Sequence, residues 1–289
     1  MGYNFNEWVL IYLEKFAKRK LKRSTYDSYV RYARHIHISK PIEDITSVDL
    51  QEVINEMSDA GLKYSTINHT AVVMRRSLRK AAQLGMCSGS LWSAIDMPSA
   101  ERRSVQILTE SQYNAFVREC NLGCSVYADA FMFMLNTGLR PGELIALKWD
   151  CVDFNRSCIE VRATAYNGQL QQPKSASGYR IVPLNRAARE ILLRQPVGVF
   201  CFTNTFGSMI NYSSMRDSFR RVMRRIGRDS GGGMHMLRHT FATRLLARGV
   251  DIKSISQLLG HADEYITMHY YLHPDFHQLH SAVETLDAL

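Results

Sequence analysis

The feature that most constrains the fold of this chain is a change of pattern close to residue 100. Before it, apolar residues recur at helical spacing, and the alternation typical of strands is absent. Residues 98–106, PSAERRSVQ, are polar and charged and begin with proline, which is typical of a linker. The sequence therefore predicts a helical domain over residues 1–97, then the linker, and a second domain over residues 107–289 that ends in a tail.

The first domain is predicted to contain four or five helices. Four of them are the segments 5–19, 24–36, 46–61 and 65–85. Ser or Thr residues that can cap a helix stand at the start of the last three, with Ser24 and Thr25 for the second helix and Ser65 or Thr66 for the fourth. Glycine ends the third and fourth segments, as it ends many helices. This domain is therefore expected to be all-helical.

The second domain is predicted to be mixed. Thr109 is a candidate cap for its first helix, TESQYNAFVREC. The segments CIEVRAT and GYRIVPL have the β-branched content of strands, and YNGQLQQPKSASG between them indicates a turn, a short strand and another turn. Helices dominate from there to the C-terminus. The predicted fold class is mainly α, with a small antiparallel β-sheet in the second domain.

The charge of the chain points to a polyanionic partner. Its formal net charge is +9, on a composition of 46% hydrophobic and 22% charged residues that is ordinary for a globular protein. Such a surplus of Lys and Arg favours nucleic acid as the partner, against the alternative of a protein that is merely basic.

Several other function classes lack a signal in the sequence. No apolar run approaches the ~20 residues of a membrane span, and no secretion signal begins the chain. The six cysteines form no C-x-x-C motif, so free cysteines in a reducing compartment are the simpler interpretation. A cytoplasmic, nucleoid-associated protein is expected.

Four short stretches carry unusual polar residues beside core sequence. In NTGLRPGELIAL, Gly138 can end one helix and Pro141 can begin the next, so Arg140 lies at a helix amino-terminal junction that suits anions. Taken alone, this stretch favours the plainer interpretation that Arg140 pairs with Glu143. In PKSASGYRIVPL, Lys174 is expected at the tip or edge of a β-hairpin, either reaching toward a ligand or as an ordinary solvated turn lysine.

The third stretch is HMLRHTFATRLLARG. His235 and Arg238 are three residues apart and share a helix face. His239 follows His235 at a spacing that can bind zinc, but the corresponding motif requires Glu where this chain has Met236. No metal site is therefore predicted, and His239 is expected to be a packed structural histidine.

The fourth stretch is LLGHADEYITMHYYLHP, in which Gly260 stops a helix and His261 follows in the turn. Together the four stretches supply two arginines, a lysine, two histidines and a nearby tyrosine, without an acidic cluster suited to Mg²⁺. This inventory suits attack on a phosphodiester without metal or other cofactor. The arginines would stabilise the developing charge, the tyrosine would be the nucleophile, and lysine and histidine would move protons.

The motifs, taken in order, resemble those of the tyrosine recombinases, the phage and transposon integrases. They are TGLRPGE, PKSASGYRIVPL, HMLRHTFAT, LLGHADE and YLHP, between Thr137 and Pro274. The resemblance implies a C-shaped clamp around duplex DNA, with the helical domain as the core-binding domain. The chain departs from the family at Ser175, where threonine is common, and at GSLW near residue 89, where the family has Asn-Pro.

The resemblance implies the role of each catalytic residue. Arg140 and Arg238 match the two phosphate-binding arginines, Lys174 matches the general acid, and His235 and His261 match the two histidines that contact or activate the scissile phosphate. The tyrosine attacks one strand to form a 3′-phosphotyrosine and frees a 5′-hydroxyl. A 5′-hydroxyl from a partner duplex then attacks the phosphotyrosine, so neither ATP nor metal is needed.

The resemblance also implies partners. A homotetramer on double-stranded DNA is expected, with the tail HQLHSAVETLDAL as the exchanged element unless it packs on its own chain. The involvement of accessory DNA-bending proteins, the presence of an arm-binding domain before this segment, and the choice between integration and excision of mobile DNA stay open.

Two basic segments outside the motifs are candidates for DNA contact. In NYSSMRDSFRRVMRRIGRDS one stripe is formed by Arg216, Arg220 and Arg224 and a second by Arg221, Arg225 and Arg228. In the first domain the candidates are Lys63, Arg75 and Arg79, beside Arg76 and Lys80. The plainer interpretation is a solvated basic face. Contacts to phosphate would make DNA affinity fall steeply with salt.

Alternatives to a site-specific recombinase remain in view. A type IB topoisomerase uses a similar set of residues to nick and reseal one duplex. A non-catalytic DNA-binding regulator could use the same fold, although all six catalytic positions are filled here. A structural helical protein with a basic face is disfavoured by the ordered motifs.

The adjacent Tyr270 and Tyr271 compete for the role of nucleophile. Successive helical residues point about 100° apart, so both cannot face one phosphate. The family's spacing after the histidine that matches His261 admits either one, and Tyr265 comes too early. Tyr271 is preferred because it forms Tyr-x-His with His273, which leaves Tyr270 for packing.

Overall fold

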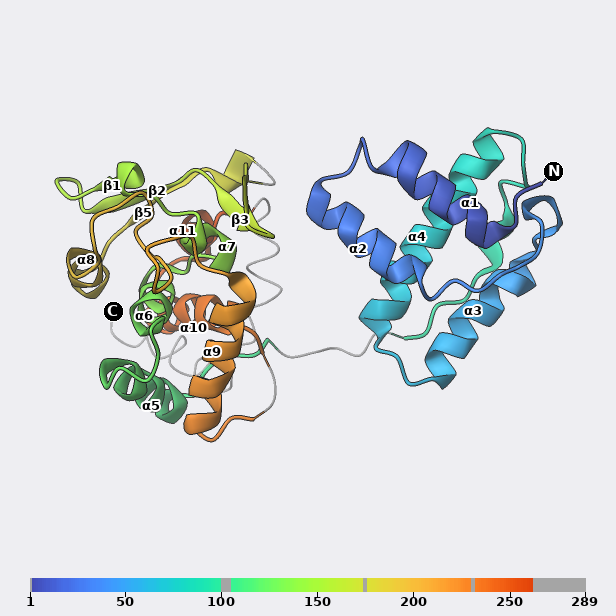
Figure 1. Cartoon of the computed structure of the whole chain (residues 1–289). Coiled ribbons are helices and arrows are strands. Elements are labelled where there is room, and N and C mark those ends of the chain that lie inside the picture. The colour runs from blue at the N-terminus through green and yellow to red at the C-terminus, as the bar shows by residue number, and fades with distance from the viewer. Residues whose placement is uncertain (1, 100–104, 174–175, 230–231, 262–289) are drawn as a thin grey trace, which may run out of the picture. The chain divides into compact units, whose positions relative to one another are not determined.

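The computed structural model (Figure 1) describes residues 2–99, 105–173, 176–229 and 232–261. Its backbone forms two compact units, residues 1–103 and 104–289. Several predicted positions lie outside the described residues: Lys174, Ser175, Tyr265, Tyr270, Tyr271, His273 and the C-terminal tail.

The described part of the first unit is all-helical, as predicted. Its helices are α1 (Phe5–Tyr12), continued by a π-helical turn (Leu13–Ala17), α2 (Arg23–Ala33), α3 (Ser47–Asp59) and α4 (Tyr64–Gln83), with short 3₁₀ turns at Ile42–Asp44 and Leu91–Ala94. Fully buried Phe5, Leu50 and Met74 belong to one apolar core. The indole of Trp8 donates a hydrogen bond to the carbonyl of Ser77 at 2.9 Å, which ties α1 to α4.

Helix capping follows the sequence at some helices and not at others. Thr46 caps α3, and Thr109 caps α5 (Glu110–Asn121), each through a hydrogen bond from a backbone N–H to its side chain. The predicted hydroxyl caps of α2 and α4 are wrong. Lys22 and Lys63 occupy those N-cap positions, because their carbonyls already accept the N–H groups of Thr25 and Thr66. The helices therefore begin before the hydroxyl residues.

The second unit adds small sheets to a set of helices, which confirms the predicted fold class. Its further helices are α6 (Ala128–Thr137), α7 (Pro141–Ile145), α8 (Arg186–Leu193), α9 (Tyr212–Arg225), α10 (His235–Leu246) and α11 (Ile252–Leu259). Antiparallel strands β1 (Val152–Asp153), β2 (Cys158–Val161) and β5 (Arg180–Pro183) form a three-stranded sheet in the order β1-β2-β5. In Figure 1 these strands lie along one side of the helices of this unit.

A separate hairpin pairs β3 (Thr164–Tyr166) with β4 (Gln169–Gln171). Asn167 and Gly168 make its turn with φ values of 46° and 74°, the left-handed pair typical of tight hairpins. The tip of this hairpin is therefore Asn167–Gly168, and position 174 follows β4 in the segment that leads to β5.

The core of the second unit is built around aromatic rings. The centroids of Phe131 and Phe219 are 5.5 Å apart, and Phe116 lies within 6.4 Å of both. Helix α6 runs through this core and packs against α10. The ends of α6 and α10 are therefore set by buried packing, and the predicted site residues lie at those ends.

The six cysteines are free, and four of them are buried, as expected. In the part of the chain that the structure describes, no helix is both long and apolar enough to span a membrane.

Candidate active site

Four of the six predicted catalytic residues lie in the described part of the chain, and they occupy three helix ends. Arg140 is at the junction of α6 and α7, His235 and Arg238 are in the first turn of α10, and His261 follows α11. Lys174 and Tyr271 lie outside the described residues. The side chains of Arg140 and Arg238 donate hydrogen bonds that cross between these helix ends.

Arg238 is the most buried of the four, with 3% of its surface exposed. Its Nη1 donates to the carbonyl of Gly138 at 2.9 Å, and its Nη2 donates to the carbonyl of Leu259 at 2.5 Å. Both carbonyls belong to the carboxyl ends of helices, α6 and α11, where a cation is favoured by the helix dipole. Arg238 therefore joins two helix ends and is fixed by them.

Arg140 caps α7 and binds Glu143, as the plainer interpretation predicted. Its Nη1 is 2.7 Å from Oε1 of Glu143, and its backbone N–H donates to Oε2 of the same carboxylate at 2.9 Å. Its Nη2 lies 3.4 Å from the carbonyl oxygen of Gly260. The side chain keeps 35% of its surface exposed, so the guanidinium remains accessible to a ligand while it is paired.

Glu143 is buried and ionised. Burial alone would raise its pKa, but the hydrogen bond and charge of Arg180, with the charges of Arg140 and Arg238, lower the pKa to about 2. A buried carboxylate with two arginine partners is the arrangement that keeps such a charge in a protein interior.

The histidines of the site have lowered pKa values. For His261, burial is the main cause and the charges of Arg238 and Arg140 add to it, giving a pKa of about 4. His235 retains exposed surface, yet desolvation by the surrounding protein, together with Arg238 and Arg140, also lowers its pKa. His239 has a pKa of about 4, because of burial and then of His235 and Arg238. The rings are therefore neutral at pH 7.

Two glycines allow the helix ends to meet. Gly138 ends α6 at a φ of 67°, and a Cβ there would lie 2.6 Å from Cδ1 of Phe241 on α10. Gly260 ends α11 at a φ of 65°, and a Cβ there would lie 2.6 Å from the carbonyl oxygen of Ser177. Both predicted glycine stops are confirmed, and the close approach explains why a larger residue would not fit.

Arg180 is a site residue that the sequence reasoning missed. It is the first residue of β5, and its guanidinium binds both carboxylate oxygens of Glu143 and the carbonyl of Leu258. A signal was available, because strand alternation places Arg180 on the same face as buried Val182. A strand pattern alone does not reveal which partner such an arginine meets.

The basic stripes of α9 differ from the prediction in part. Arg228 is not available as part of an exposed basic stripe, because its Nη1 donates hydrogen bonds to the carbonyl of Ile107 and to the side chain of Gln112, both at 2.8 Å. Arg216 and Arg220 both pair with Asp217, whose Oδ1 lies 3.1 Å from Nε of Arg216 and 3.4 Å from Nη1 of Arg220. Arg224 is exposed and has no acidic partner within the described residues.

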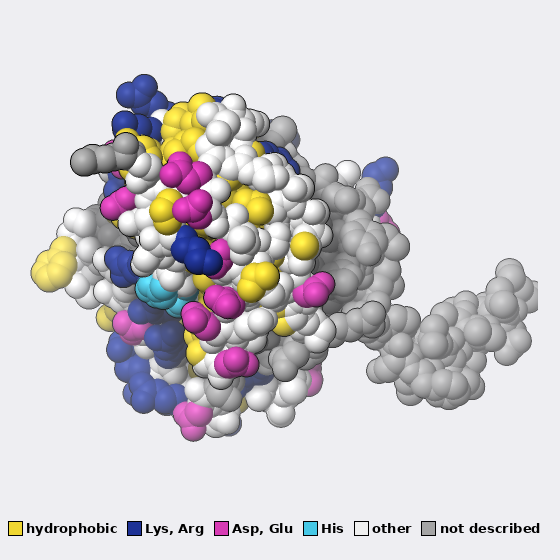
Figure 2. Space-filling view, turned by 90° about the vertical axis from the view of Figure 1, so that its right-hand side faces the viewer, with side chains coloured by type: hydrophobic (Ala, Val, Ile, Leu, Met, Phe, Trp, Pro, Cys, Tyr) yellow, Lys and Arg dark blue, Asp and Glu magenta, His cyan; other side chains and the backbone are white. Residues whose placement is uncertain are grey.

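Three basic residues of the first unit that are predicted to contact DNA, Lys63, Arg75 and Arg79, are exposed. Lys63 precedes α4, and Arg75 and Arg79 stand one turn apart on it, beside a groove that Trp92 also lines. The adjacent Arg76, in contrast, stacks on Tyr29 at 5.7 Å. Figure 2 shows one face of the molecule, on which Lys and Arg side chains gather at the left edge and acidic side chains lie nearer the middle.

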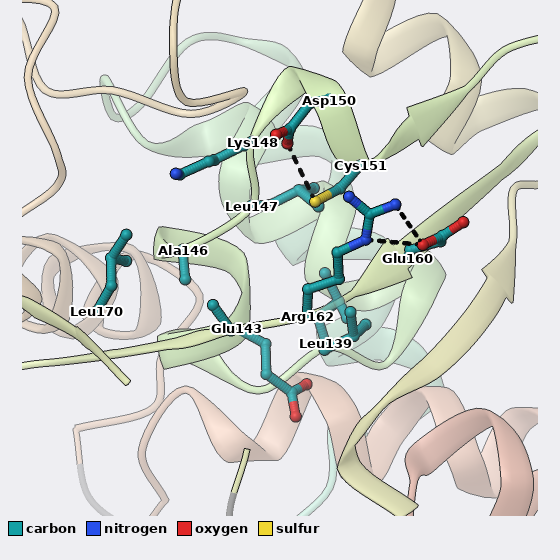
Figure 3. A pocket seen from close by; sticks show the side chains of 12 residues that line it. Leu139, Glu143, Ala146, Leu147, Lys148, Asp150, Cys151, Glu160, Arg162 and Leu170 are labelled. Carbon is teal, nitrogen blue, oxygen red and sulfur yellow. Dashed lines mark hydrogen bonds and ion pairs between the residues drawn. The ribbon is translucent and has the colours of Figure 1, made fainter. Parts of the chain in front are cut away.

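A small cavity of about 140 Å³ adjoins the site (Figure 3). The Cys151 thiol in its wall donates to Asp150 at 3.3 Å, and Arg162 binds Glu160. Burial and then Asp150 raise the pKa of Cys151, so the thiol is a poor nucleophile. Figure 3 shows the carboxylate of Glu143 turned away from these pairs. Glu143 therefore lines the cavity, while its carboxylate, which binds Arg140 and Arg180, points away from the pairs in the cavity wall.

Family models match most of the chain. The Phage integrase family model covers residues 106–278, and the model of the phage integrase N-terminal SAM-like domain covers residues 4–58. Tyrosine recombinase XerC of Xylella fastidiosa (strain M23) is 30% identical over 91% of this chain and 90% of its own length. Tyrosine recombinase XerC-like of Caldanaerobacter subterraneus subsp. tengcongensis is 26% identical over 96% of this chain and 81% of its own length.

Solved structures share the fold. The Tn1549 transposon integrase in complex with transposon right end DNA has a TM-score of 0.81 at 23% identity, covering 99% of this chain and 100% of that one. A lambda integrase tetramer bound to a Holliday junction has a TM-score of 0.77 at 20% identity, covering 93% and 77%. With the family model spanning the second unit, these findings show that the chain belongs to the phage integrase family, the tyrosine recombinases.

Proposed function

We propose that this tyrosine recombinase is a site-specific enzyme that cleaves and rejoins DNA strands through a 3′-phosphotyrosine, in the integration or excision of mobile DNA. The observation that supports it best is the meeting of Arg140, Arg238 and His261, where the carbonyls of Gly138, Leu259 and Gly260 fix both arginines. Two cations held at one place suit the two non-bridging oxygens of a phosphodiester.

In the proposed first step, the hydroxyl oxygen of Tyr271 attacks the scissile phosphorus. The bond from phosphorus to the 5′ oxygen breaks, and Lys174 donates a proton to that oxygen as it leaves. The tyrosine proton passes to a neutral histidine or to water. In the second step a 5′-hydroxyl from a partner duplex attacks the phosphotyrosine and releases the tyrosine, so the number of phosphodiester bonds is unchanged.

The histidines suit this chemistry because they are neutral before DNA binds. The pKa of His261 is about 4, so at neutral pH its ring can accept a proton or a hydrogen bond. A phosphate anion beside the ring would favour the protonated form and raise that pKa. His261 and His235 can therefore take up a proton when the phosphate is in place.

Double-stranded DNA is the proposed partner, at the nucleoid in the cytoplasm. The similar Tn1549 and lambda integrases are described in complex with DNA, the latter also as a tetramer on a Holliday junction. By this likeness, residues 1–97 act as a core-binding domain that clamps the duplex, and residues 107–289 hold the catalytic site. We further propose that the protein forms a homotetramer on DNA whose subunits exchange their C-terminal tails, and that accessory DNA-bending proteins take part.

The test begins with DNA sequences selected by the protein from a random library. The selected site is rebuilt as a nicked suicide substrate, so that cleavage releases a short strand and traps the covalent protein. Wild type is expected to form an adduct that resists denaturant, and Tyr271→Phe is expected to form none. Absence of the wild-type adduct would reject the proposal and favour a DNA-binding regulator.

A second assay distinguishes the type IB topoisomerase alternative. Two duplexes that carry the selected site are incubated with wild type, and a supercoiled plasmid with the same site is incubated separately. A recombinase is expected to yield Holliday junctions and exchanged strands. Relaxation of the plasmid without any exchange would instead indicate a nicking-resealing enzyme.

A further inference from the structure

The side chain of Arg180 is directed at four protein acceptor atoms, one of which is the carbonyl oxygen of Gly178, 3.4 Å from its Nη1. Its Nε donates to the carbonyl of Leu258 at 2.6 Å. Its Nη2 and Nη1 lie 2.9 and 3.2 Å from the two carboxylate oxygens of Glu143. Only 6% of the side chain is exposed. Arg180 is thus held inside the second unit, unlike the more exposed Arg140.

These bonds join parts of the site that are far apart in sequence. Leu258 lies in the last turn of α11, two residues before Gly260 and three before His261. Glu143 is the carboxylate that also binds Arg140. Arg180 begins β5, six residues after Lys174. One guanidinium therefore connects the turn of His261, the cap of α7 and the strand that follows the lysine segment.

Close steric contacts also fix the described residues from Ser177 to Arg180, at the beginning of β5 and just before it. A Cβ at Gly260 would lie 2.6 Å from the carbonyl oxygen of Ser177 and 2.9 Å from Cδ of Arg180. A Cβ at Gly178 would lie 2.5 Å from Cβ of Pro173. The residues on either side of positions 174 and 175 are thus packed on each other and on the end of α11.

Arg180 also sets the charge around Arg140. Glu143 paired with Arg140 alone would be a neutral couple, with little attraction for a phosphate. With Arg180 on the other side of the carboxylate, the three groups keep one net positive charge. The low pKa of Glu143 is consistent with this balance of charge, because Arg180 lowers that pKa more than Arg140 does.

We propose that Arg180 is a positioning residue for strand cleavage. It holds Ser177 and the start of β5, which follow Lys174 in the chain, against the turn that carries His261, and it balances Glu143 so that Arg140 keeps its charge for the scissile phosphate. The inference rests on the proposed function, because it takes Lys174 as the general acid.

The test uses the leaving group. A thiolate leaves without protonation, so a suicide substrate with sulfur in place of the 5′-bridging oxygen does not need a general acid. With the oxygen substrate, Arg180→Gln and Arg180→Lys are expected to cleave on the order of 10- to 100-fold more slowly than wild type, within the range that general acids contribute. With the sulfur substrate, most of the loss is expected to disappear for Arg180→Lys, which keeps the charge beside Glu143, and only part of it for Arg180→Gln, which does not. The DNA affinity of Arg180→Lys is expected to stay within about twofold of wild type.

The controls separate the outcomes. Arg162→Gln removes an exposed arginine of the same unit that pairs with Glu160 and is expected to cleave both substrates like wild type. If Arg180→Gln does not fold, Arg180→Lys keeps the charge beside Glu143 and carries the test. Wild-type rates in the Arg180 variants, or equal losses on both substrates, would overturn the inference while leaving the proposed function intact. A wild-type protein that forms no adduct would overturn the function itself.

Discussion

At the scale of single residues, the site depends on cations that satisfy helix carboxyl ends. Arg238 is buried and binds the carbonyls of Gly138 and Leu259, whereas Arg140 is partly exposed and shares Glu143 with Arg180. A buried carbonyl that loses its donor costs more than an exposed ion pair that is broken. The two arginines therefore differ in what they contribute to folding, although both are assigned to phosphate binding.

This difference predicts unequal effects on stability. Arg238→Gln is expected to lower the free energy of unfolding by about 2 to 3 kcal/mol, because two helix-end carbonyls lose their donors. Arg140→Gln is expected to lower it by less than about 1 kcal/mol, because Glu143 keeps Arg180. Urea unfolding of both variants checks this, and equal losses would show that Arg238 does not join the helix ends in solution.

The histidines predict an acid-dependent loss of stability. An unfolded histidine titrates near pH 6.5, and His239 in the fold has a pKa of about 4. Between these values the unfolded chain binds a proton that the folded chain does not. Stability from this group is complete above about pH 6.5 and is lost as the pH falls through about 4. His239→Gln is expected to flatten, in part, the decline of the urea midpoint between pH 7 and pH 5. An unchanged slope would contradict the lowered pKa.

Sequence reasoning located site residues better than it described their partners. Arg140, Arg238 and His261, which lie at neighbouring helix ends in the structure, were proposed as site residues from the order of short motifs and from the glycines beside them. Arg180 was missed because an arginine in a strand is ordinarily expected to be exposed to solvent. The packing of the end of α11 over this arginine is a tertiary contact that the strand pattern does not reveal. Arg228 was misassigned because its partners, Gln106, Ile107 and Gln112, lie more than 100 residues away in sequence.

At the scale of elements, the site is a meeting of helix ends, and the glycines decide how closely they approach. Gly138 and Gly123 both have a positive φ, at 67° and 72°. Only Gly138 has a neighbour in the way, since Phe241 would contact a Cβ there, while nothing lies within 4 Å of a Cβ at Gly123.

The pair provides a matched test of that packing. Gly123→Ala is expected to cost about 1 kcal/mol, from the left-handed backbone alone. Gly138→Ala is expected to cost about 3 kcal/mol, because overpacking against α10 adds to the backbone term. Thermal and urea unfolding measure both variants, and equal costs would mean that α6 and α10 separate easily at this point.

The helix boundaries show where local signals are decisive. Thr46 and Thr109 could be identified as caps because each is followed, three residues later, by a side chain that completes a reciprocal box, Asp49 or Gln112. Ser24 also has an acidic residue three places later, Asp27, but that carboxylate binds Arg23 and the helix begins before Ser24. Ser65 is followed at that spacing by Asn68, and its helix also begins at an earlier residue. The spacing of a hydroxyl residue and an acidic residue therefore does not by itself decide where a helix begins, because the acidic side chain can bind another partner.

At the scale of the whole molecule, the fold class followed from the change of pattern near residue 100. Helical periodicity predicted the first unit, and β-branched segments predicted β2 and β5. The convergence of Arg140, Arg180, Arg238 and His261 could not be predicted from periodicity, because it depends on contacts between elements that are distant in sequence. The resemblance to a family provided the assignment of roles that periodicity could not.

The basic surface predicts a salt-dependent affinity that differs between arginines of one helix. Arg224→Gln is expected to lower the slope of log affinity against log salt by about 1, as loss of one phosphate contact does. Arg228→Gln is expected to leave the slope unchanged, because its guanidinium is bound to Gln106, Ile107 and Gln112. Fluorescence anisotropy with the selected duplex across a salt series measures both. A lower slope for Arg228→Gln together with an unchanged slope for Arg224→Gln would show that DNA binds to another face of this unit.

We propose that the converging helix ends direct one tyrosine, Tyr271, at the scissile phosphate. The most direct measurement is mass spectrometry of the peptide that remains on DNA after proteolysis of the trapped adduct, with Tyr270→Phe as the matched control for Tyr271→Phe. The phosphotyrosine is predicted at Tyr271, with the adduct retained in Tyr270→Phe and lost in Tyr271→Phe. A nucleotide on Tyr270 or Tyr265, or an undiminished adduct in Tyr271→Phe, would contradict this account.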